Sequence, residues 1–194
     1  VATNALLEGQ KAQTLLFVTE GFGDLCQIGD MTRPSLFDPK QTWPPPLTSH
    51  IIEVKGRMDV NGVEIEPLSL PNVSIDAFES VGIALLHSPQ NPRHEQQLAS
   101  YLQTLKPDLF ISLGHLQSTG VGYLARIQTT LVDAAITPIL QEALTRDELP
   151  SGSLAIRSDG SLCSFHELGA PDAVLSGPAG GVLGVLAVAK QAGF

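Results

Sequence analysis

The amino-acid sequence predicts an α/β fold, a mixed sheet with flanking helices and β-hairpins. Short apolar runs rich in β-branched residues, typical of buried strands, alternate with segments whose apolar residues recur at a helical period. Two other segments contain the two-residue turn signals Asn61-Gly62 and Asp159-Gly160, which are typical of hairpins because these residues tolerate positive φ.

The first half of the chain supplies a strand, a crossover and a hairpin. Thr14–Thr19 is a short apolar run that predicts a buried strand. Asp38–Pro46 contains three consecutive prolines and is expected to be a surface crossover. Ile51–Asp59 and Val63–Leu68 are the expected arms of the first hairpin. Asp76–Val81 is at most a short helix.

The middle of the chain predicts a second strand, Gly82–His87, followed by a turn and a helix that ends near Leu105. Asn91 suits the helix cap and Pro92 suits the first helical position. Pro107 ends the helix. The residues expected on its apolar face are Leu98, Leu102 and Leu105.

The second half begins with a third strand at Asp108–Leu113. Gly122–Ala143 has the apolar period of a helix, and Pro138 is expected to kink or re-cap it. Ser153–Phe165 is the second hairpin, and Ala173–Leu175 is a short predicted strand.

The last segment is the most informative local pattern. The predicted strand leads into Ser176-Gly-Pro-Ala-Gly-Gly181, which is expected to be a turn before a helix over Val182–Lys190. Glycines let backbone N–H groups approach an anion, and a helix N-terminus adds free donors. The spacing matches neither a Walker loop nor a dinucleotide-binding fingerprint, so tight packing is the favoured alternative to phosphate binding.

Composition and charge exclude several classes of protein. The chain has 194 residues, of which 43% are hydrophobic and 16% charged, which is typical of a globular protein. It carries 20 acidic and 11 basic residues. An acidic surface argues against a partner that is a nucleic acid or an anionic membrane.

The cysteines and the apolar runs predict a cytoplasmic location. Cys26 and Cys163 form no Cys-x-x-Cys pair, so a disulfide framework is not expected. The longest apolar run, Val182–Ala189, is too short to span a membrane, and Val1–Glu8 does not resemble a signal peptide. A first residue that is Val and not Met fits a fragment or a processed product.

Few side chains outside the glycine-rich segment suggest chemistry. His87 and His94 flank one turn, but their spacing does not predict a metal site, and capping or core roles are favoured. Arg33 has aspartates before and after it, which indicates an ion pair or, alternatively, an anion site. Cys26 has no adjacent base to activate it. We therefore predict no catalytic residue and no metal ligand in the chain.

Several ordered segments resemble the hydantoinase A / 5-oxoprolinase family. They span nearly the whole chain and occur in the family's order. The segments are Val1–Glu8, Thr19–Asp24, Ile28-Gly29, Arg33-Pro34, Phe37-Asp38, Leu85–Ser88, Asn91-Pro92, His94-Glu95, Ser158–Gly160 and Ser176–Val182.

The resemblance implies an actin/hexokinase-like ATPase architecture. It also implies that the full-length parent uses ATP and Mg²⁺ to open a cyclic amide, of the hydantoin or 5-oxoproline type, by phosphorylating it. A second hydantoinase subunit and an oligomeric parent are expected. Related subunits serve ketone carboxylases, so the alternatives are an ATP-using carboxylase subunit and a non-catalytic subunit-interaction domain.

The chain departs from the family pattern at the phosphate-binding motifs. Asp-x-Gly-Gly-Thr loops hold nucleotide in such folds, and none occurs between Val1 and Phe194. After Leu113 the family carries a charged segment of which only Arg126 and Thr129-Thr130 remain. The isolated chain is therefore expected to be an inactive fragment with no bound cofactor.

The resemblance and residue polarity together predict where ligands bind. The expected substrate-facing residues are Thr3, Asn4, Arg33 and His87, and the expected phosphate-facing residues are Ser176, Gly177, Gly180 and Gly181. Residues 1–175 are expected to form the N-terminal or central hydantoinase-oxoprolinase domain. Residues 176–194 are expected to start the next nucleotide-binding segment.

Overall fold

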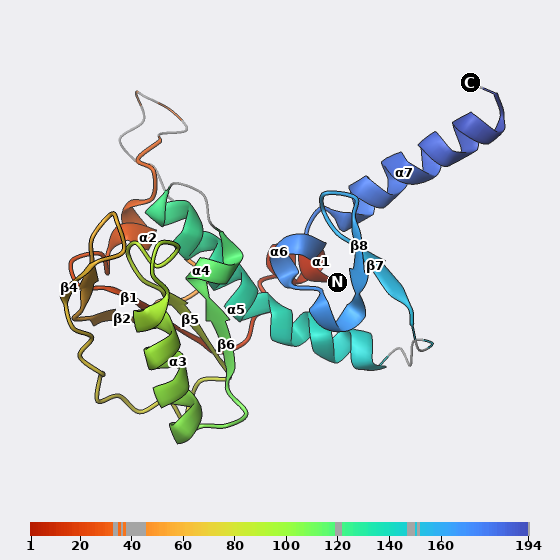
Figure 1. Ribbon diagram of the computed structural model, residues 1–194. Coiled ribbons are helices and arrows are strands. Elements are labelled where there is room, and N and C mark those ends of the chain that lie inside the picture. Colours follow the sequence, from red (N-terminus) through yellow and green to blue (C-terminus); the bar gives the residue numbers. More distant parts are fainter. Residues whose placement is uncertain are drawn as a thin grey trace. The chain divides into compact units, whose positions relative to one another are not determined.

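The computed structural model divides the chain into two compact units (Figure 1). It describes residues 1–32, 35, 37, 46–118, 122–146, 150 and 152–193. The first unit combines Val1–Lys11 with Ile136–Phe194, and the second unit is Ala12–Ala135. We call them the terminal unit and the sheet unit and describe each by itself.

A four-stranded parallel sheet forms the centre of the sheet unit. Its order is β2-β1-β5-β6, and its strands are β1 (Thr14–Thr19), β2 (Ile51–Val54), β5 (Ser80–Ala84) and β6 (Phe110–Leu113). All residues of β1 and β5 are buried, which explains why both segments read as continuous apolar runs. The α/β prediction is confirmed, as are the strands predicted at Thr14–Thr19 and Asp108–Leu113. The strand predicted at Gly82–His87 is present as β5 but ends three residues earlier, so His87 lies in the turn that follows it.

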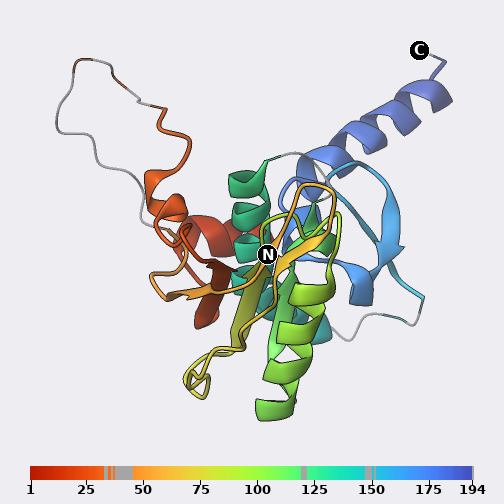
Figure 2. The ribbon, with the colours of Figure 1, turned by 60° about the vertical axis from the view of Figure 1, so that its left-hand side comes forward.

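Helices cover both faces of this sheet because successive strand residues point to opposite sides. Leu15 and Phe17 pack in one cluster with Leu98 and Leu102 of α3 (Arg93–Leu105), and Figure 2 shows α3 along this face. The alternate residues of β1 pack with α5 (Tyr123–Arg146) on the other face. Two short helices, α2 (Leu25–Ile28) and α4 (Gly114–Gln117), follow β1 and β6.

The first predicted hairpin is confirmed, but its first arm is shorter than predicted. β3 (Arg57–Met58) pairs antiparallel with β4 (Glu64–Glu66) around the Asn61-Gly62 turn. The segment before it is the separate strand β2, which pairs with β1. The break falls at Gly56, which has φ 139° and whose added Cβ would lie 2.9 Å from the Leu68 Cα.

The helix before β6 also differs in detail from the prediction. It begins at Arg93, with Pro92 at the N-cap and the Asn91 side chain accepting the Arg93 N–H at 3.1 Å. Leu98 and Leu102 are buried, whereas Leu105 is 48% exposed. Asp76–Val81 contains a turn and the start of β5 instead of a helix.

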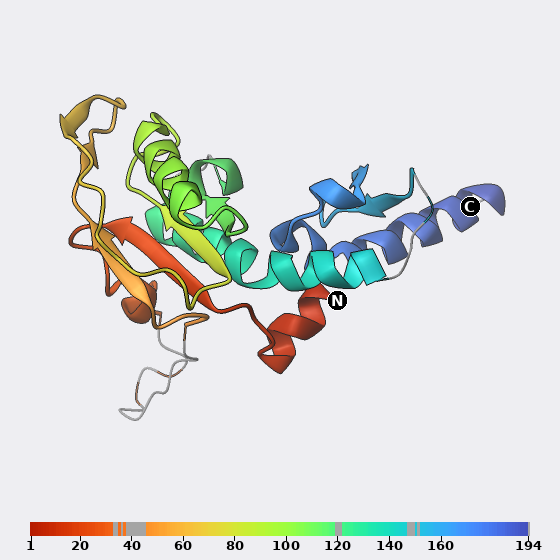
Figure 3. The same ribbon diagram turned by 90° about the horizontal axis from the view of Figure 1, so that it is seen from below.

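The terminal unit contains α1 (Ala2–Glu8), the last part of α5 and the second predicted hairpin. That hairpin, β7 (Leu154–Ile156) and β8 (Leu162–Ser164), is confirmed. A short 3-10 helix, η1 (Phe165–Glu167), follows it. Figure 3 shows the hairpin beside α7 (Ser176–Gln191), and Leu183 and Ile156 pack against glycines at this contact.

The predicted strand and turn before α7 are wrong. Ala170–Ala173 forms the short helix α6, and α7 begins at Ser176, so the glycine-rich segment is helical. Pro178 lies in the first turn of α7, where the N–H that proline lacks would have no helical acceptor.

Two further predictions concern prolines. Helix α5 is continuous over Pro138, so it is not re-capped there, and the two units divide between Ala135 and Ile136, just before this proline. Nearly all of the predicted crossover Asp38–Pro46 lies outside the described residues. No helix in the described part of the chain has both the length and the apolar character needed to cross a membrane.

Candidate ligand site at the carboxyl edge of the parallel sheet

The strand order places a topological switch point between β1 and β5. The strand that follows β1 in the sequence, β2, lies beside β1 toward one edge of the sheet. The strand that follows β5 in the sequence, β6, lies beside β5 toward the opposite edge. In parallel α/β sheets the crevice at the carboxyl ends of two such strands is the usual position of a ligand. The residues at the ends of these strands therefore form the candidate site.

A partly buried tyrosine links the ends of β1 and β5. The Tyr123 hydroxyl donates to the Ala84 carbonyl at 2.8 Å and accepts the Thr19 N–H at 3.1 Å. The Thr19 hydroxyl in turn accepts the Leu86 N–H at 2.9 Å. Burial raises the pKa of Tyr123 to about 12, so the phenol is neutral at physiological pH.

A buried carboxylate links the ends of β5 and β6. Glu95, on α3, is fully buried, and one of its oxygens accepts the Leu85 N–H at 2.8 Å. The other oxygen accepts the His115 N–H at 3.0 Å and lies 2.6 Å from His115 Nδ1. Gly114 is required here because an added Cβ would lie 2.9 Å from the same carboxylate.

Two buried polar groups at this edge have no hydrogen-bond partner within the described part of the chain. They are Nε of Arg126, whose side chain belongs to the first turn of α5, and the hydroxyl of Ser88, in the loop after β5. Arg126 is only 4% exposed, and its guanidinium carbon lies 5.4 Å from the centre of the Tyr123 ring. Burial lowers the pKa of Arg126, while the negative charge of Glu95 raises it to a smaller extent.

One predicted substrate-facing residue, His87, lies at the same edge. It has φ 60°, a left-handed conformation that side chains other than glycine rarely adopt. The pKa of Asp59 in the first hairpin is lowered mainly by the backbone N–H of Val63, with a smaller electrostatic contribution from His87. Local strain of this kind is concentrated at binding sites. Arg33, predicted together with His87, lies outside the described residues.

The weaker candidates take structural positions. His94 is buried and its Nε2 lies 2.7 Å from a Glu64 carboxylate oxygen, in agreement with a satisfied core role. Burial raises the pKa of the Cys26 thiol and so disfavours the nucleophilic thiolate. Among the described residues no group of three or more His, Cys, Asp or Glu side chains is arranged to hold a metal ion.

The remaining predicted residues belong to the terminal unit. The Thr3 hydroxyl donates to the Val174 carbonyl at 2.6 Å and thereby ties α1 to the residues just before α7. Asn4 is exposed on α1. The Ser176 hydroxyl donates to the Ala173 carbonyl at 2.8 Å. Thr3 and Ser176 therefore lie in one unit, whereas His87 belongs to the other.

The glycines predicted to face phosphate lie on α7. Added Cβ atoms at Gly177 and Gly181 would meet no atom within 4 Å, whereas one at Gly180 would lie 3.4 Å from Ile156. A Cβ at Gly180 would make only an ordinary van der Waals contact with the hairpin. Two of the glycines thus leave the helix backbone open to close approach.

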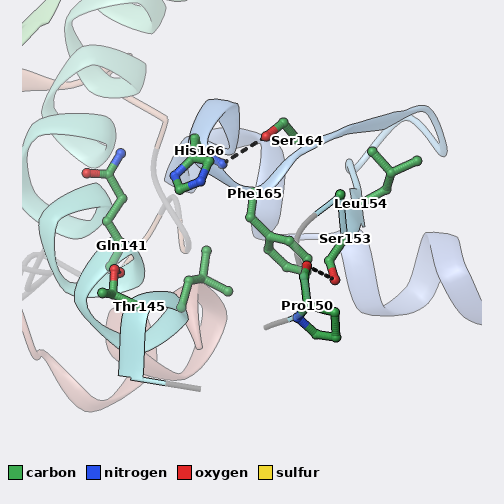
Figure 4. A pocket seen from close by; sticks show the side chains of 10 residues that line it. Gln141, Thr145, Pro150, Ser153, Leu154, Ser164, Phe165 and His166 are labelled. Atoms are coloured by element: carbon green, nitrogen blue, oxygen red, sulfur yellow. Dashed lines mark hydrogen bonds between the residues drawn. The ribbon is translucent and has the colours of Figure 1, made fainter. Parts of the chain in front are cut away.

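A separate pocket of about 500 Å³ lies in the terminal unit, between the end of α5 and the second hairpin. Figure 4 shows its side chains, among them Gln141, Thr145, Ser153, Phe165 and His166. No predicted site residue lines it.

The comparisons with known proteins agree with this fold and sequence. A sequence profile of the hydantoinase/oxoprolinase N-terminal region matches residues 1–105, and a second, hydantoinase/oxoprolinase, matches residues 126–194. The chain belongs to the hydantoinase/oxoprolinase family. The resemblance of its ordered segments is therefore confirmed.

Relatives in this family are much longer than the chain. The chain is 32% identical to 5-oxoprolinase 1 of Arabidopsis thaliana, with 95% of the chain and 17% of that protein aligned. It is 28% identical to caprolactamase subunit alpha of Pseudomonas jessenii, with 100% of the chain and 31% of that protein aligned. The chain thus spans less than a third of either relative.

Two solved structures share the fold. The crystal structure of the ATP-dependent caprolactamase from Pseudomonas jessenii matches with a TM-score of 0.81 and 24% identity. The nucleotide-free structure of acetone carboxylase, described under the mechanism of ATP-dependent acetone carboxylation, matches with a TM-score of 0.78 and 18% identity. Each alignment covers 100% of the chain and 31% of the other protein.

Of the polar side chains at this edge of the sheet, the sequence singled out only His87 as ligand-facing. Glu95 lies in a segment that carries the family resemblance, and His115 follows directly after a predicted strand. Arg126 stands out in the sequence only as a remnant of a family segment. The sequence does not show that these residues lie close together, because they come from different elements and meet only in the folded sheet unit.

Proposed function

We propose that the full-length parent is an ATP-dependent hydrolase of cyclic amides. The observation that carries the proposal is the family match over residues 1–105 and 126–194, in which relatives are named as a 5-oxoprolinase and a caprolactamase. An amide carbonyl is a poor electrophile. Transfer of a phosphoryl group to its oxygen makes the carbon electrophilic, so that water can add to it. The C–N bond of the ring then breaks as the nitrogen takes up a proton, and a second water attacks the carbon of the resulting acyl phosphate and releases phosphate.

Most groups that hold ATP and Mg²⁺ would lie in other parts of the parent. We propose this because the Asp-x-Gly-Gly-Thr loops that hold nucleotide in such folds do not occur between Val1 and Phe194. Residues 176–194 are proposed as the start of the next nucleotide-binding segment. The open backbone at Gly177 and Gly181 supports this role, with Ser176 and Gly180 beside them.

The proposed substrate-facing residues are Thr3, Asn4, Arg33 and His87. Support comes from the position of His87 at the switch point and from its left-handed backbone. A second subunit and an oligomeric parent are proposed from the name of the caprolactamase subunit. The two unpaired cysteines support a cytoplasmic parent.

Phosphate release by the purified parent tests this function. We expect ATP hydrolysis to rise when 5-oxoproline, hydantoin or caprolactam is added, with ring-opened product formed in step. A His87→Ala variant tests the substrate-facing side and should raise the KM for the amide more than the KM for ATP. Phosphate release that none of these amides stimulates would contradict the function.

An ATP-using subunit of a ketone carboxylase is the second candidate, favoured by the fold shared with acetone carboxylase. Dependence of ATP turnover on bicarbonate and a ketone would identify it.

The third candidate is a non-catalytic interaction domain. The apolar residues of α7, such as Val182 and Val185, are exposed within the terminal unit and would suit a protein partner. Co-purification with a second subunit, without any ATP turnover by the complex, would favour this candidate.

A further inference from the structure

Arg126 is a buried cation that the described residues do not neutralise. It is 4% exposed, its Nε has no hydrogen-bond partner, and the ion pairs found among the described residues do not include it. Burial of the Nε–H without an acceptor is costly, because water no longer solvates this donor of a charged group. Proteins rarely keep such a group unless something else supplies the opposite charge.

Among the described residues, the charged and aromatic groups around Arg126 do not supply this opposite charge. Glu95 influences the guanidinium at longer range, but both oxygens of this carboxylate are engaged by Leu85 and His115. Tyr123 is neutral and offers only its ring, 5.4 Å from the guanidinium carbon. A ring face gives a modest electrostatic attraction and no hydrogen-bond acceptor for Nε.

The position of Arg126 favours a small-molecule ligand. Its neighbour Tyr123 bonds to the last residues of β1 and β5, so the guanidinium lies near the carboxyl ends of the two strands at the switch point. The hydroxyl of Ser88, which has no hydrogen-bond partner among the described residues, follows β5 at the same edge. Ligands of parallel α/β sheets bind at this edge.

We propose that Arg126 binds an oxyanion, a phosphoryl group or a carboxylate, of a small molecule held at the carboxyl ends of β1 and β5. A guanidinium matches both anions, because its N–H groups form parallel bonds to two oxygens. Both sources are chemically compatible with the proposed function, since a phosphorylated amide carries the first anion and 5-oxoproline carries the second.

Nuclear magnetic resonance of the arginine Nε–H groups tests this directly on the 194-residue chain. Inorganic phosphate, acetate and 5-oxoproline are titrated separately, and the Arg126 signal is assigned by its loss in Arg126→Lys. We expect the Arg126 signal to shift and saturate while that of Arg146, exposed on the same helix, stays in place. A response to phosphate alone identifies a phosphoryl group as the anion that Arg126 binds. A response to acetate and 5-oxoproline alone identifies a carboxylate. No saturable shift with any of the three overturns the proposal.

Variants separate binding from a structural role. Arg126→Lys keeps the charge but loses the planar fork, so anion affinity should fall by about tenfold or more, whereas Arg146→Lys should leave it unchanged. Arg126→Met removes the buried charge, so without anions it should melt no lower than wild type, and anions should not stabilise it. A large loss of stability in Arg126→Met, with anion binding unchanged in Arg126→Lys, would assign the arginine to structure alone.

This inference stands apart from the proposed function. A parent that hydrolyses ATP in response to a cyclic amide, but whose Arg126 signal ignores all three anions, would keep the function and lose the site. An Arg126 that binds anions, in a parent whose ATP hydrolysis is not stimulated by cyclic amides, would keep the site and lose the function.

Discussion

The substitution Glu95→Gln tests the network that holds the carboxyl edge together. The carboxylate accepts the backbone N–H groups of Leu85 and His115 and pairs with the His115 ring. A glutamine has one acceptor oxygen, so it satisfies one backbone N–H and turns its own NH₂ group toward the other donors. One buried N–H then lacks an acceptor, which costs about 1–3 kcal/mol. Loss of the charge-assisted bond to His115 adds about 1 kcal/mol.

We therefore expect Glu95→Gln to lower the free energy of unfolding of the sheet unit by about 3 kcal/mol. Urea denaturation measures this change, provided that the slope with denaturant stays equal to that of wild type. The matched control is Glu142→Gln, which removes an exposed i,i+4 ion pair with Arg146 and should change stability by less than about 0.5 kcal/mol. A Glu95→Gln effect no larger than the control would refute the network.

Three further predictions address stability. Tyr123→Phe should cost about 2 kcal/mol at neutral pH, because two buried backbone groups lose their partner. The tyrosine pKa is about 12 in the folded chain, against 10.0 for a fully solvated tyrosine, so stability from its neutral form is complete below pH 10 and lost as the pH rises toward 12. The gap between wild type and the variant should narrow over this range in urea titrations, and a constant gap would argue against a buried phenol. Gly114→Ala should cost about 2 kcal/mol from the clash with the carboxylate, whereas Gly181→Ala, with open space around it, should be neutral or stabilising by about 1 kcal/mol in thermal melts. Leu102→Ala should cost about 3 kcal/mol and the half-exposed Leu105→Ala less than about 1 kcal/mol, and equal losses would contradict the observed face of α3.

The central strands β1 and β5 could be predicted because burial on both faces leaves a local signature. β1 reads as an uninterrupted apolar run, since a central parallel strand has no solvent-facing side. The hairpins were equally predictable from Asn61-Gly62 and Asp159-Gly160, whose residues fix the turn without help from the rest of the fold. The strands and the hairpin turns each depend on a few adjacent residues.

The segment before α7 could not be read in the same way. Gly177, Gly180 and Gly181 have low helix propensity and predicted a turn, yet the segment is helical from Ser176 onward. Propensity is a weak indicator, and packing of Ile156 and Leu183 at the hairpin contact helps to hold this helix. The sequence held no sign of that contact.

Of the candidate site, only His87 carried a signal in the sequence. It is the last residue of a predicted strand, so a position near the carboxyl edge of the sheet could be expected. Glu95, Tyr123 and Arg126 come from α3 and α5, and their proximity depends on how these helices cover the sheet. No spacing along the chain encodes that arrangement.

Transfer of oxygen from substrate to phosphate tests the central claim most directly. The parent is supplied with ATP and a cyclic amide whose carbonyl oxygen is labelled with ¹⁸O, and the released phosphate is analysed by mass spectrometry. If the amide oxygen is phosphorylated and its bond to carbon then breaks, the account predicts one ¹⁸O in each phosphate released with a ring opening. Ring opening that leaves all the label in the product, with unlabelled phosphate, would contradict it.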